Sequence, residues 1–211
     1  MIDVQQLVEK FIDKAVYSLI DEKIGGIPLR EIDERAIEGL LAKSGLDRSK
    51  RIEGWLRSYG VFQGVKAPAR VMIADKVVEF ADQISDEPKS YSDPIILQEF
   101  DRLHKLVKSI TLDREVISLC SKALWACYPY CVPIYDSFAC RALWVIGRLL
   151  DIHVQNNGNR NPYPQFHAVW CRLYEQCLPY IQDEKLRGYP YKVRVFDKII
   201  WLIGQPTFEM P

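Results

Sequence analysis

The sequence has no excess of charge of either sign. Its 211 residues include 28 lysines and arginines and 28 aspartates and glutamates, so the formal net charge at neutral pH is zero. A protein that binds nucleic acid without sequence preference needs a positive electrostatic potential over much of its surface. The charge balance excludes that class of protein, and any contact with DNA would have to come from a local basic patch.

Long apolar runs are also missing. No run approaches the roughly 20 apolar residues that cross a bilayer. The first 23 residues, MIDVQQLVEKFIDKAVYSLIDEK, carry charges throughout their apolar pattern, whereas a secretory signal has an uncharged apolar centre. We therefore expect no membrane partner and a cytoplasmic location.

Histidine is scarce, and no compact cysteine pair occurs. The three histidines have no helical i, i+4 pairing, and no two cysteines have the C-x2-C spacing of a metal site. The sequence therefore predicts no metal site and no cofactor, although an iron–sulfur cluster remains an alternative. Six cysteines lie among apolar neighbours, which favours buried, reduced thiols: Cys120, Cys127, Cys131, Cys140, Cys171 and Cys177.

Apolar residues make up 48% of the chain and recur at three- and four-residue intervals, which indicates helices. Strand-like alternation never persists for more than a few residues. The pattern predicts an all-α fold of about nine helices, near 4–20, 28–42, 48–60, 68–84, 93–110, 114–128, 137–150, 164–183 and 191–203. We expect one helical domain over residues 1–211, which could form two lobes with a break near 85–93, and an exposed loop at 155–164.

One constellation stands out in the second half of the chain. It consists of Ser121-Lys122-Ala123-Leu124, then Val132-Pro133-Ile134-Tyr135-Asp136-Ser137, with Arg141 five residues after the aspartate. This arrangement, over about residues 113–150, resembles the core of the helix-hairpin-helix DNA glycosylase superfamily, which includes endonuclease III. In that superfamily a helix carries a lysine, an extended run follows, and an aspartate caps the next helix.

The resemblance implies a two-lobed helical bundle that cleaves an N-glycosidic bond in DNA, with Lys122 as the nucleophile and Asp136 as its electrostatic partner. An aspartate at a helix N-terminus is held ionised by backbone N–H groups, so it can stabilise a cationic sugar. A partly desolvated lysine has a lowered pKa and can attack as a neutral amine. The glycine-rich hairpin of the superfamily is absent, because Asp113-Arg114-Glu115-Val116 stands in its place.

Side chains around the constellation would bind the substrate. The resemblance and the aromatic clustering assign this role to Trp125, Tyr128, Tyr135 and Arg141, which would surround a flipped base. Aromatic residues at helical spacing are also typical of a core, so core packing is the alternative.

The most basic stretch of the chain is RSKRIEGWLRSYG at 48–60. Arg48, Lys50, Arg51 and Arg57 are its candidates for binding nucleic acid phosphates, and a solvated helix face is the alternative.

A second hypothesis needs no enzyme. Asp136 can serve only as a helix cap, and the stem of Lys122 can cover Trp125 while its amine reaches solvent. The chain would then be a helical interaction module or a DNA-binding module without catalysis.

Overall fold

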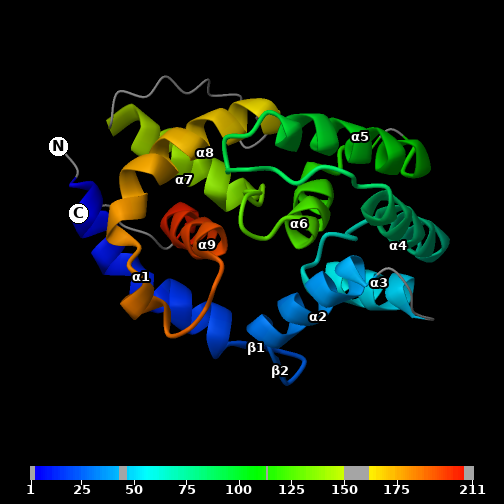
Figure 1. Cartoon of the computed structure of the whole chain (residues 1–211), viewed down its shortest axis with the longest axis horizontal. Coiled ribbons are helices and arrows are strands. Elements are labelled where there is room, and N and C mark those ends of the chain that lie inside the picture. The colour runs from blue at the N-terminus through cyan, green and yellow to red at the C-terminus, as the bar shows by residue number, and fades with distance from the viewer. Residues whose placement is uncertain (1–2, 43–46, 113, 150–161, 207–211) are drawn as a thin grey trace. The chain divides into compact units, whose positions relative to one another are not determined.

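The computed structural model describes residues 3–42, 47–112, 114–149 and 162–206 (Figure 1). In these ranges the chain forms nine α-helices, two short 3-10 helices and one two-stranded hairpin. These are α1 (Val4–Ile20), β1 (Lys23–Ile24), β2 (Ile27–Pro28), α2 (Leu29–Leu41), α3 (Arg48–Ser58), α4 (Ala67–Asp82), α5 (Ile95–Ile110), α6 (Ile117–Cys127), α7 (Ser137–Leu149), α8 (Tyr163–Cys177), η1 (Leu178–Tyr180), η2 (Asp183–Leu186) and α9 (Lys192–Gly204).

The predicted all-α class is confirmed, and the predicted helices match the observed ones within a few residues except at 164–183, where α8 ends at Cys177 and the 3-10 helix η1 follows. Most of the Asn-rich loop expected at 155–164 lies outside the described residues. None of the described helices is both long enough and apolar enough to cross a membrane.

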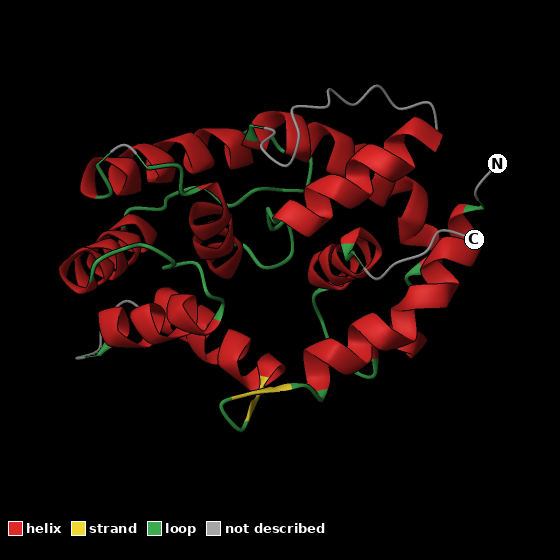
Figure 2. Cartoon of the chain, turned by 180° about the vertical axis from the view of Figure 1, so that it is seen from behind, coloured by secondary structure: helices red, strands yellow, loops and turns green. Residues whose placement is uncertain are grey.

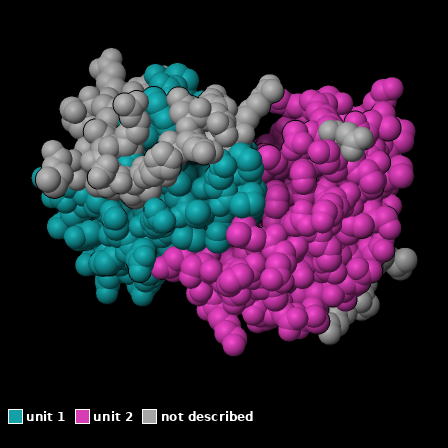
Figure 3. All heavy atoms as spheres, turned by 90° about the horizontal axis from the view of Figure 1, so that it is seen from above, with its two compact units in different colours: residues 1–22, 133–211 teal, residues 23–132 magenta. Residues whose placement is uncertain are grey.

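The chain divides into two compact units (Figure 3). Unit 1 combines the segment up to Glu22 with the chain from Pro133 onward, and unit 2 is Lys23–Val132. The break expected near 85–93 is not where the units divide, because this loop lies inside unit 2. Side chains hold it there: the Tyr128 hydroxyl donates a hydrogen bond to the Asp86 carbonyl at 3.0 Å, and the Cys131 thiol contacts the Pro88 carbonyl at 3.5 Å.

In unit 1, α9 packs against both α1 and α7, and α8 packs against α7 and α1. The crossing of α7 and α9 is close. A Cβ atom added to Gly204 at the end of α9 would lie 1.7 Å from the backbone oxygen of Phe138 in α7. Glycine at this position therefore permits the two helix backbones to touch.

In unit 2, α6 is the central helix and packs against α2, α3 and α5. Every residue from Leu119 to Cys127 is buried, so α6 has no solvent-facing side along this stretch. Helix α3 packs against α2, α4 and α6, and its exposed residues are Lys50, Arg51, Gly54 and Arg57.

The hairpin β1–β2 precedes α2 and is the only sheet in the described residues (Figure 2). Gly25 and Gly26 form its turn with φ values of 61° and 87°, a left-handed conformation that glycine adopts without strain. The sequence predicted only a helix end here, because strands of two residues are too short to show alternation.

Candidate functional site

Lys122 lies on α6 inside unit 2 and is only 5% exposed. Its amine donates a hydrogen bond to the Ser118 hydroxyl at 2.8 Å and lies 5.7 Å from the centroid of the Tyr59 ring. The amine is therefore engaged with side chains of unit 2, in contrast to the solvent-reaching lysine that we considered as an alternative.

Asp136 lies in unit 1, immediately before α7. Its Oδ1 atom accepts a hydrogen bond from the Phe138 backbone N–H at 2.8 Å, so the predicted helix cap is confirmed. Lys122 and Asp136 thus belong to different units, and their meeting in one site stays a prediction.

The extended segment before Asp136 is anchored by two groups of unit 1. Asp197 on α9 is 2% exposed and accepts hydrogen bonds from the Ile134 N–H at 3.0 Å and from the Trp170 indole N–H at 2.8 Å. The Tyr163 hydroxyl donates to the Pro133 carbonyl at 2.9 Å. Sequence reasoning missed Asp197, although a lone aspartate among the apolar residues of α9 was a usable signal.

A second lysine, Lys198 on α9, lies within electrostatic reach of Asp136 in the same unit. Its amine is 4.0 Å from the Trp201 ring centroid and 3.9 Å from a Glu22 carboxylate oxygen. Burial and the Arg194 charge lower the pKa of Lys198 to about 8, against the opposing effects of Glu22 and Asp136. Near neutral pH a fraction of this amine is therefore unprotonated.

The predicted substrate-contacting aromatic residues are buried. Trp125 is fully buried and stacks on Trp55 at 6.4 Å between ring centroids. Tyr128 is 6% exposed, and burial raises the pKa of its hydroxyl. Tyr135 is 7% exposed and Arg141 is exposed. The three aromatic residues are therefore part of the core, which was the alternative interpretation of their helical spacing. Arg141 is exposed to solvent.

Arg48 faces inward, unlike the other basic residues of α3. It is 8% exposed, and its guanidinium donates hydrogen bonds to the carbonyls of Gly39 at 2.8 Å and Leu40 at 3.0 Å. It also pairs with Asp82 of α4. A cation at the C-terminal end of a helix can donate hydrogen bonds to the last carbonyls, and its charge interacts favourably with the helix dipole. Arg48 thus holds the end of α2, and this corrects its expected place on the phosphate-binding face.

Arg51 and Arg57 line a groove of about 770 Å³ between the hairpin, α2 and α3. The sequence did not predict that Arg35 of α2 joins them. The groove lining has one acidic side chain, Glu38, and two of its three arginines are paired with glutamates outside the lining, so the local charges balance and only Arg51 has no ion pair among the described residues. Its walls are apolar and consist of Ile24, Ile27, Ile32, Ala36 and Trp55.

The three arginines differ in how they are paired. Arg35 is paired with Glu31 and Arg57 with Glu53 along their own helices, and these two arginine side chains are 58% and 60% exposed. Arg51 is exposed, and among the described residues its side chain makes no hydrogen bond or ion pair. Exposed ion pairs contribute about 0 to 1 kcal/mol, so an arriving phosphate can replace them.

The Trp55 wall of the groove is hydrogen-bonded to a buried carboxylate behind it. Asp33 is 1% exposed and accepts hydrogen bonds from the Trp55 indole N–H at 3.1 Å and from the Tyr59 hydroxyl at 2.6 Å. Lys122 lies against the same Tyr59 ring.

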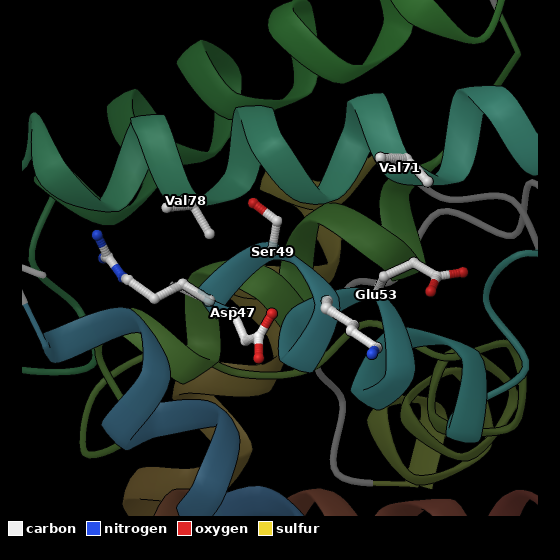
Figure 4. A pocket seen from close by; sticks show the side chains of 7 residues that line it. Asp47, Ser49, Glu53, Val71 and Val78 are labelled. Carbon is white, nitrogen blue, oxygen red and sulfur yellow. The ribbon is translucent and has the colours of Figure 1, made fainter. Parts of the chain in front are cut away.

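Lys50 lies on another side of α3. It lines a groove of about 600 Å³ between α3 and α4, where Ser49 points from α3 toward α4 between Val71 and Val78 (Figure 4). Asp47 and Glu53 also line this groove, and the charge of Arg48 is neutralised by Asp82. The two positive and two negative side chains that line this second groove balance, and Lys50 is its only cation that points away from the core.

All six cysteines are free thiols. The described residues contain no group of three or more histidine, cysteine, aspartate or glutamate side chains that could hold a metal ion. Comparison of the chain with protein-family models, curated proteins and solved structures finds no match.

Proposed function

We propose that the protein binds nucleic acid through the groove of unit 2, with Arg35, Arg51 and Arg57 contacting phosphates. The observation that carries this proposal is the convergence of three exposed guanidinium groups from two helices on one groove. A guanidinium group can bind a phosphate through two parallel hydrogen bonds, a bidentate geometry. Arg51 supplies local attraction, and a phosphate can take the place of the weak exposed ion pairs of Arg35 and Arg57.

The test is binding of a fluorescent oligonucleotide, followed by anisotropy across a series of salt concentrations. We expect the triple variant Arg35→Gln, Arg51→Gln, Arg57→Gln to bind at least about tenfold more weakly. The slope of log affinity against log salt should become shallower by about two on a single strand and by nearly three on a duplex, because each lost phosphate contact removes about 0.7 or 0.9 units respectively.

The matched control is Lys105→Gln on α5, which removes a cation that is 75% exposed and lies outside the groove. It should leave affinity and salt slope unchanged. Absence of binding by the wild-type protein even at low salt would reject the proposal. Equal losses in Lys105→Gln and in the single variant Arg51→Gln would reject the groove as the interface.

A second candidate function is cleavage of an N-glycosidic bond at Asp136. Two observations favour it: the carboxylate of Asp136 is fixed as a helix cap, and the unit that holds it also supplies an amine with a pKa of about 8, Lys198. A neutral amine can attack C1′ of the sugar while the base leaves with the bonding electrons and takes up a proton, and opening of the sugar ring then gives an imine.

Borohydride trapping on duplexes that carry damaged bases tests this second candidate. A covalent adduct that Lys198→Ala abolishes and Lys122→Ala retains would place the nucleophile on α9, and the reverse result would place it on α6. If no adduct forms and no base is released from any duplex, the catalytic proposal fails while nucleic acid binding stands.

A further inference from the structure

The groove of unit 2 has more apolar surface than a phosphate-binding face requires. Ile24 is 36% exposed, and Ile27 and Ile32 are half-buried, so their side chains present apolar surface beside the arginines. A volume of about 770 Å³ is in the range of pockets that enclose small organic groups. Phosphates alone would leave this apolar surface in water.

We infer that the groove receives an unpaired nucleobase and that the protein therefore binds single-stranded nucleic acid in preference to duplex. The inference rests on the proposed function and names its substrate class. Arg51 and Arg57 would contact the phosphates on either side of the inserted base.

The chemistry of the walls fits a flat, largely apolar ring with polar edges. Isoleucine side chains can cover the faces of a base, and a guanidinium plane can stack on it. Glu38 and Ser58 also line the groove and supply a carboxylate acceptor and a hydroxyl for the polar edges. In a duplex the faces of the bases are hidden by stacking, so only an unpaired base can enter.

The groove is also preorganised. The hydrogen bond from the Trp55 indole N–H to the buried Asp33 carboxylate orients this wall of the groove before a ligand arrives. An oriented wall lowers the conformational entropy that binding must remove. The base would therefore bind to a groove whose Trp55 wall is already oriented in the free protein.

A substitution that fills the groove separates base binding from phosphate binding. Gly54 lines the groove on α3, and a Cβ atom added there meets nothing within 4 Å. Gly54→Leu therefore keeps all three arginines and favours the helix, because leucine is a better helix former than glycine. Its thermal unfolding midpoint, compared with wild type, verifies that the variant is folded.

The probes are a single-stranded oligothymidine, a duplex of the same length, and a single strand of the same length and charge whose sugars lack bases. We expect wild type to prefer the oligothymidine over the duplex and over the baseless strand by about tenfold. Gly54→Leu should lose this preference while its duplex affinity stays within about twofold of wild type.

Equal affinity of wild type for the oligothymidine and the baseless strand overturns the inference and leaves the proposed function in place. An unchanged preference in Gly54→Leu overturns it as well, because the base would then bind elsewhere. Failure of wild type to bind any of the probes would instead reject the proposed function itself.

Discussion

At the scale of single residues, Asp197 decides how the chain enters α7. Its carboxylate accepts from one backbone N–H and one indole N–H, and both donors are buried with it. A buried donor that loses its acceptor costs about 1 to 3 kcal/mol. The position of the extended segment, and hence of Asp136, depends on this carboxylate.

We predict that Asp197→Ala lowers the free energy of unfolding by about 2 to 5 kcal/mol, because two buried donors lose their acceptor. Asp183→Ala is the matched control, since Asp183 is 80% exposed and only pairs with Lys192 at 3.0 Å. Its cost should stay below about 1 kcal/mol. Urea denaturation of both variants measures the difference, and similar costs would contradict the role assigned to Asp197.

Single residues also mark a limit of sequence reasoning. Arg48, Arg51 and Arg57 are chemically identical and share one helix. Only the neighbours differ, because α2 brings its terminal carbonyls to Arg48 while the other two face a groove. Composition and spacing predicted a basic helix, but they could not tell which of its arginines is already engaged.

At the scale of elements, the crossing of α7 and α9 depends on Gly204. We predict that Gly204→Ala lowers the free energy of unfolding by about 1 to 3 kcal/mol, because the added methyl group forces the two backbones apart. Gly39→Ala in α2 is the control, since its Cβ would meet nothing within 4 Å.

The control should be neutral or stabilising by up to about 1 kcal/mol, since alanine favours the helix over glycine. Thermal or urea unfolding of both variants measures the contrast. A stable Gly204→Ala protein would show that the two helices do not need this close approach.

At the scale of the whole molecule, the buried thiols make stability depend on alkaline pH. Burial raises the pKa of Cys127, Cys140, Cys171 and Cys177 to about 12, from an ordinary value of 9.0. In the unfolded chain these thiols ionise near pH 9 and stabilise the unfolded state. Their contribution to stability is complete below pH 9 and is lost as the pH rises toward about 12.

Lys198 acts in the opposite direction. Its pKa is lowered from 10.5 to about 8 in the folded protein, so its contribution to stability increases between about pH 8 and 10.5. Each group changes stability by at most about 1.4 kcal/mol per pH unit. Four thiols therefore outweigh one amine.

We predict a lower free energy of unfolding at about pH 10 than at about pH 8. Urea denaturation under reducing conditions at the two pH values measures this change. Equal or greater stability at the higher pH would show that the thiols are accessible to water in the folded protein.

The helices could be predicted from the sequence, because apolar periodicity and helix ends depend on residues a few positions apart. The cap formed by Asp136 is of this local kind, and it was predicted correctly. The tertiary structure alone decided the division into units, which joins the chain up to Glu22 with the chain from Pro133 onward. It also decided that Arg35 meets Arg51 and Arg57 at one groove, because such meetings depend on how separate helices pack.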